Sequence, residues 1–154
     1  MRFLLISAAL FVSSHTNANE LLKKFDTKEL SFSVIISSDC LVEQRDIEIV
    51  VEDVFLSSGI KPNNDTWYSD AIHLRVSISC LATPNNYPVF ITNAIFVDYS
   101  PSTKFLHAVL SKEYFRLGIG SKSIALNSIK VSVQNAISDF IKINHMASDQ
   151  GKEG

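Results

Sequence analysis

The chain of 154 residues carries little charge and no excess of positive charge. Charged residues make up 19% of it, and 14 basic residues against 16 acidic ones leave a net charge of −2. This balance excludes a protein that binds nucleic acid by neutralising phosphates over a basic surface. With 46% hydrophobic residues, the chain is also too apolar for a disordered protein. Its length favours one domain with a sizeable core.

No apolar run has the length of about 20 residues that a membrane-spanning helix needs. A short run at residues 3–12 follows the basic Arg2 and precedes a polar stretch that ends at Ala18. This pattern is typical of a secretory signal peptide, so we expect residues 1–18 to be removed on export to the periplasm or the extracellular space. The alternative is that residues 3–12 form a buried helix of the mature fold. Loss of Arg2 changes the net charge to −3, which leaves nucleic acid excluded as a partner.

Only two cysteines are present, Cys40 and Cys80. In an oxidising compartment such a pair is expected to form a disulfide, worth about 4 kcal/mol in the chain-entropy account. The chain has no Cys-x-x-Cys motif, and no further ligands stand near either cysteine. A thioredoxin-like redox site and a zinc site are therefore not indicated. Two buried free thiols are the alternative.

The apolar periodicity predicts six elements in one domain at residues 19–147, followed by a disordered tail at residues 148–154. Alternating residues predict strands at 30–37, 71–80, 89–99 and 104–117. The last strand is expected to be irregular near residues 111–113. Amphipathic patterns predict helices at 41–58 and from residue 121 or 123 to residue 146. Residues 37–39 offer N-caps for the first helix, and Gly59 offers its C-terminal stop.

This order, strand–helix–strand–strand–strand–helix, predicts an α+β fold with one mixed four-stranded sheet and two amphipathic helices packed on one face. The first strand–helix–strand unit should be parallel, so the carboxyl ends of its two strands share an edge of the sheet. Cys40 follows the first of these strands and Cys80 ends the second. The predicted topology therefore favours the disulfide.

Residues that carry chemistry form no catalytic motif. Residues 118–121 lack the second glycine of a nucleophile elbow and the lysine of a phosphate-binding loop, so they predict a tight turn between strand and helix. The acidic residues between Glu43 and Asp53 fall on the solvated face of a helix. His73 and His107 would share a metal only if their strands were neighbours. We therefore predict no cofactor, no metal site and no catalytic residues.

A partner surface is expected on the uncovered face of the sheet or along an edge strand. The polar residues of the second strand should lie on that face: His73, Arg75, Ser77 and Ser79. Trp67 and Tyr68, in the preceding loop, would add an aromatic contact patch. The alternative for Trp67 is packing over the edge of the sheet.

The order of elements behind a signal peptide resembles small periplasmic domains related to the amino-terminal domain of Tol translocation protein B and to curli-secretion-type lipoproteins. Residues 58–61 (Ser-Gly-Ile-Lys) and the strand at 72–76 carry this resemblance. Residues 117–121 and the helix with Asp139-Phe140-Ile141 are similar to a broad group of uncharacterised exported bacterial proteins. The chain departs from lipoproteins because no cysteine follows the apolar run. The resemblance implies a non-enzymatic binding or assembly domain with a protein partner in the cell envelope.

Two other functions stay open at this point. A small secreted hydrolase, or an inhibitor of one, is the first alternative, and as an enzyme it would gather His73 or His107 with a serine or a carboxylate in a cleft. A small-ligand carrier would need a cavity of at least about 300 Å³ between the helices and the sheet. The sequence leaves the oligomeric state undetermined.

Overall fold

A computed structural model gives the structure of the chain and describes residues 30–63, 72–83, 88–100, 105–108 and 114–150. The predicted signal peptide at residues 1–18 lies outside these ranges. The elements are β1 (Ser31–Ile36), α2 (Gln44–Ser57), β2 (Ile72–Leu81), β3 (Val89–Ser100), β4 (Phe105–Ala108), β5 (Tyr114–Ile119) and α3 (Lys122–Gln150). They confirm the predicted α+β class and its order of elements.

The strands form one mixed sheet in the order β1-β2-β3-β4, with β5 also paired to β3. β1 and β2 are parallel, as predicted, and the other pairs are antiparallel. β5 pairs with residues 89–94 of β3 and β4 pairs with residues 97–100, so the two short strands share the fourth position of the sheet.

The predicted irregular fourth strand therefore consists of β4 and β5. Ala94 faces Tyr114 and Val97 faces Ala108, so the register of β3 with β5 differs by three residues from its register with β4. The predicted slip itself falls at residues 111–113, which lie outside the described residues.

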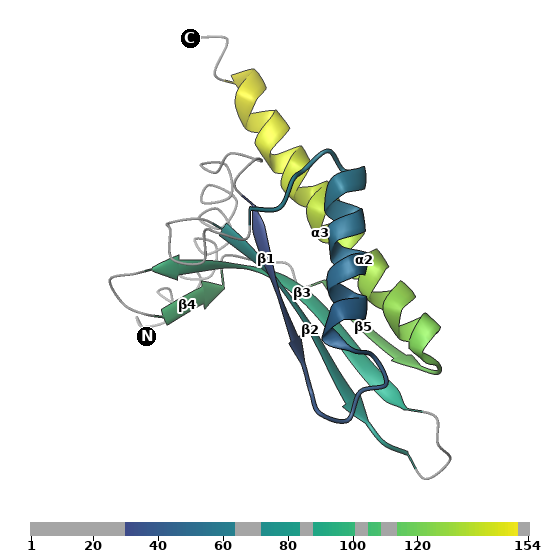
Figure 1. The fold of residues 1–154 in the computed structure, drawn as a ribbon. Helices are drawn as coiled ribbons and strands as arrows, with labels where there is room; N and C mark the ends of the chain where they lie inside the picture. The colour runs from purple at the N-terminus through teal and green to yellow at the C-terminus, as the bar shows by residue number, and fades with distance from the viewer. Residues whose placement is uncertain (1–29, 64–71, 84–87, 101–104, 109–113, 151–154) are drawn as a thin grey trace, which may run out of the picture.

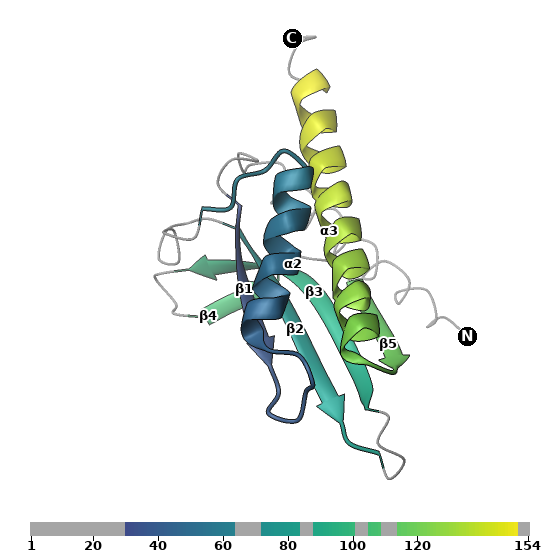
Figure 2. The same cartoon turned by 45° about the vertical axis from the view of Figure 1, so that its right-hand side comes forward.

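Both helices pack on the same face of the sheet, as predicted (Figures 1 and 2). α2 lies against β1 and against α3, and α3 covers β3 and β5. The aromatic rings of the core join the two layers: the Phe32 and Phe55 centroids are 5.4 Å apart, and those of Phe96 and Phe140 are 5.3 Å apart. The predicted apolar face of β2 is at most 7% exposed at each position: Ile72, Leu74, Val76, Ile78 and Cys80.

The ends of α2 show one prediction that holds and one that fails. Residues 37–39 do not cap the helix; it begins at Gln44, and the Asp46 carboxylate accepts a hydrogen bond of 3.0 Å from the Glu43 N–H. At the other end Gly59 has a φ of +76°, as its predicted role requires. The Ile60 N–H donates to the Phe55 carbonyl at 3.0 Å. This is the hydrogen bond of a Schellman motif that spans six residues.

α3 is longer than its apolar stripe indicates. The helix continues to Gln150, beyond the expected end at Met146, so residues 148–150 are helical and the predicted tail is wrong for them. Propensity explains the extension, because residues after an established helix add one hydrogen bond each at small cost. Within the described part of the chain, neither helix combines the length and the apolar content that crossing a membrane requires.

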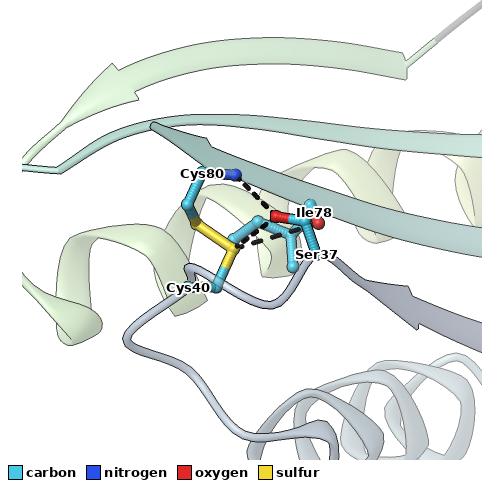
Figure 3. Close-up of a disulfide and its surroundings, with 4 residues drawn as sticks. All are labelled: Ser37, Cys40, Ile78 and Cys80. Atoms are coloured by element: carbon cyan, nitrogen blue, oxygen red, sulfur yellow. Dashed lines mark hydrogen bonds between the residues drawn. A yellow bond between two sulfur atoms is a disulfide. The ribbon is translucent and has the colours of Figure 1, made fainter. Parts of the chain in front are cut away.

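The disulfide between Cys40 and Cys80 confirms the predicted pairing (Figure 3). Its Cα atoms are 5.0 Å apart. Beside it the Ser37 N–H donates to the Ile78 carbonyl at 3.0 Å, and the Cys80 N–H donates to the Ser37 hydroxyl at 3.0 Å. The carboxyl ends of β1 and β2 are thus joined by one covalent bond and two hydrogen bonds.

Candidate functional site

The uncovered face of the sheet differs from the predicted polar surface. Ser79 is exposed, and Arg75 and Ser77 are half-buried. His73 is a correction, because only 2% of its surface is exposed, so it offers no contact to a partner. Alternation along β2 assigned His73 to the right face but does not show what covers a face. Trp67 and Tyr68 lie outside the described residues, so their predicted contact patch is not described.

His73 is instead part of a buried polar pair. Ser31 of β1 lies directly opposite it in the parallel register. The Ser31 hydroxyl is hydrogen-bonded to Nδ1 of the imidazole. Ser31 is 0% exposed, so the pair joins the two strands inside the protein.

This pair brings together a serine and a histidine, as the hydrolase alternative required. A nucleophile must, however, be reachable by its substrate. The complete burial of Ser31 denies that access, so the geometry fits a structural contact between strands. His73 and His107 would share a metal only if their strands were neighbours, and that condition is not met because β3 separates β2 from β4. Among the described residues no three His, Cys, Asp or Glu side chains cluster in a way that would hold a metal ion.

The space between the helices and the sheet is filled by core side chains. Phe55 of α2, Phe96 of β3 and Phe140 of α3 are each at most 1% exposed. A groove of about 410 Å³ lies at the edge of these layers, between β1 and the adjacent side of α2. It exceeds the volume stated for a small-ligand carrier, but it lies at the edge of the sheet and not in the core between the layers.

The most exposed apolar surface of the sheet lies on the face away from the helices. Its members, which we call the apolar patch, are Leu81 (66% exposed), Ile91 (36%), Phe115 (53%), Leu117 (64%) and Ile119 (63%). Leu117 lies opposite Ile91, while Ile119 and Leu81 lie on either side of Val89. The patch therefore spans β2, β3 and β5 in adjacent rows.

Sequence reasoning missed the apolar patch although part of its signal was present. Phe115, Leu117 and Ile119 alternate with residues that point the other way, which is a strand pattern. We expected the strand to end at residue 117 and assigned residues 118–121 to a turn, whereas β5 continues to Ile119. The expected partner surface on this face named only polar residues of β2 and no residue of β5.

No family model and no curated protein matches the chain. Among solved structures, the dodecamer of a PelC variant from Paraburkholderia phytofirmans matches with 15% identity and a TM-score of 0.43, over 70% of this chain and 88% of that one. A minor lipoprotein from Acinetobacter baumannii has 11% identity and a TM-score of 0.35, covering 80% of this chain and 95% of its own. The rare lipoprotein B from Shewanella oneidensis has 19% identity and a TM-score of 0.30, covering 79% and 96%.

These three similarities are too distant to assign a function. The resemblance to the amino-terminal domain of Tol translocation protein B stays a prediction.

Proposed function

We propose that the protein is an exported, non-enzymatic binding or assembly domain of the bacterial envelope, and that its apolar patch binds a protein partner. The patch is the observation that carries the proposal. It places five large apolar side chains, each at least 36% exposed, on the face that no described helix covers. Contiguous exposed apolar surface of this kind marks sites of interaction in folded proteins.

The neighbouring groups fit a protein partner. Asn93 lies beside Phe115 in the register, and Ser79 lies beside Ile91, so polar groups border the apolar side chains. An apolar centre with a polar rim is the usual arrangement of a protein interface. The Cys40–Cys80 disulfide supports an oxidising compartment such as the periplasm.

The proposal is tested by capture from an envelope fraction of the source bacterium with the tagged mature chain, residues 19–154. Leu117→Glu places a charge in the patch, and Ile124→Glu is the matched control because Ile124 is 50% exposed at the start of α3. We expect one identified protein to bind the unaltered chain and the control, and to bind the Leu117 variant at least about tenfold more weakly. The purified partner should bind the unaltered chain and the control with similar affinity, and the Leu117 variant more weakly.

Two results would overturn the proposal. One is capture that does not change with Leu117→Glu. The other is a dimer of the purified chain, measured by sedimentation, that Leu117→Glu dissociates, because the patch would then be an interface between two copies.

A further inference from the structure

A second surface, the outer edge of β1, carries backbone groups that no described strand pairs. In a parallel pair, alternate residues of an edge strand direct both their N–H and their C=O at the neighbouring strand. The Ser37 N–H donates to the Ile78 carbonyl of β2, which assigns the odd-numbered residues of β1 to the inner side. Phe32, Val34 and Ile36 therefore direct their N–H and C=O groups outward.

The beginning of this edge supports the assignment. Leu30 is even-numbered like Phe32, Val34 and Ile36, so its carbonyl also points outward. It accepts a hydrogen bond of 3.2 Å from the Asn63 N–H. The outer side of the strand is thus able to take a backbone partner. Beyond this contact, within the described ranges, β1 has β2 as its only paired strand.

A groove of about 410 Å³ follows the same edge. Four consecutive residues of β1 line it, together with one side of α2 and the long side chain of Arg75. The lining residues of α2 are Gln44, Arg45, Glu48 and Glu52. A strand added beside β1 would occupy this groove, with α2 on one side of it.

On the α2 side of the groove two carboxylates, those of Glu48 and Glu52, outnumber the one guanidinium of Arg45. Glu48 and Glu52 lie one turn apart on α2, and Gln44 and Arg45 both contact Glu48, at 2.8 and 3.6 Å. Glu52 makes no ion pair or hydrogen bond with the described residues, so its carboxylate is available. On the sheet side Arg75 lies next to Ser33 in the register. Both residues line the groove.

We propose that the outer edge of β1 binds an extended segment of a partner protein as an additional strand, with Lys or Arg side chains directed at Glu48 and Glu52. The backbone of Phe32, Val34 and Ile36 supplies the hydrogen bonds, and the charges of α2 select the sequence. Because side chains alternate along a strand, every second residue of the segment faces α2. This edge lies at the opposite side of the sheet from β5, so the inference goes beyond the apolar patch and does not depend on it.

The test uses capped hexapeptides that alternate valine with a charged residue, and measures their binding to the oxidised mature chain by calorimetry and by amide shifts in NMR spectra. We expect the lysine peptide to bind at least about tenfold more tightly than the glutamate peptide. The largest shifts should fall on Phe32, Val34 and Ile36. Glu52→Lys should reverse the preference between the peptides. Asp53→Lys makes the same change of charge on the exposed side of the same helix, so it is the matched control and should keep the preference.

Backbone methylation separates strand addition from simple charge attraction. Two lysine peptides carry N-methyl groups on alternate amides, one at odd and one at even positions. Only one of these sets faces β1 in a strand, so one peptide should lose binding and the other should keep it. Equal binding by both would overturn the proposal.

Three further outcomes decide the matter. Lysine and glutamate peptides of equal affinity, or no binding of either, would overturn the proposal. A dimer of the chain that Glu52→Lys dissociates would assign the edge to a second copy and overturn it as well. Leu117→Glu should leave peptide binding unchanged, and Glu52→Lys should leave capture by the apolar patch unchanged, so the failure of one proposal is distinguishable from that of the other.

Discussion

Gly118 of β5 lies directly opposite Phe90 of β3, and the ring of Phe90 occupies the space that a side chain at position 118 would enter. A Cβ atom built on Gly118 would be 2.4 Å from Cζ of Phe90. Phe90 is 1% exposed and belongs to the core. The glycine therefore serves the packing of an aromatic ring inside the sheet.

Gly118→Ala should destabilise the protein by about 1–3 kcal/mol, the usual cost of overpacking a core. The free energy of unfolding in urea measures the loss. Phe90→Leu removes the ring atoms that the new methyl group meets, so the alanine should cost less in that background, as a double-mutant cycle would show. An equal cost in both backgrounds would contradict the contact as the cause.

Replacing Cys40 and Cys80 together by serine should lower the free energy of unfolding by about 2–5 kcal/mol, because the cross-link restricts the unfolded chain. Urea unfolding of the variant is compared with that of the oxidised protein. Reductant should shift the unfolding of the unaltered chain toward that of the variant and should leave the variant unchanged. Alkylation followed by mass spectrometry checks the bond directly; two alkylated thiols without reductant would contradict it.

The fold was predictable because hydrophobic periodicity was clear where it mattered. Ile72, Leu74, Val76 and Ile78 alternate along β2, and this pattern identified both the strand and its core face. The parallel arrangement followed from a helix between two strands, and it brought Cys40 close to Cys80. Each of these inferences used neighbours in sequence or a simple rule of topology.

The candidate site was less predictable because it depends on which strands are neighbours. His73 reads as an exposed strand residue until its partner Ser31 and its burial are known. The apolar patch combines Leu81, Ile91 and Leu117, which only the register of three strands brings together. Similarly, the groove at β1 can be predicted only when α2 is known to lie beside the edge of that strand. None of these relationships has a local pattern in the sequence.

Tyr114 should make the protein less stable at alkaline pH. Burial raises the pKa of its hydroxyl above the ordinary 10.0, and the hydrogen bond to Asp139, 3.0 Å long, raises it further. Above pH 10 the unfolded tyrosine loses its proton while the folded one keeps it, so the free energy of unfolding falls as the pH rises. In Tyr114→Phe the free energy of unfolding, measured in urea from about pH 9 to about pH 11, should fall less steeply as the pH rises. An unchanged slope in the variant would contradict the prediction.

The ion pair between Asp46 of α2 and Lys122 of α3, 2.6 Å long, should make stability depend on pH at the acid end. The hydrogen bond from Lys122 and then the Glu43 N–H lower the pKa of the Asp46 carboxyl below its ordinary 3.8. The pair therefore contributes stability above about pH 4, and the contribution is lost as the pH falls through the lowered pKa. Lys122→Met should remove this contribution. Urea unfolding from about pH 2 to about pH 6 should then show a lower free energy of unfolding for the variant than for the unaltered chain. This difference should become smaller as the pH falls and in high salt. Lys130→Met, also exposed on α3, is the control. If both variants followed the same pH profile, the ion pair would not be the cause.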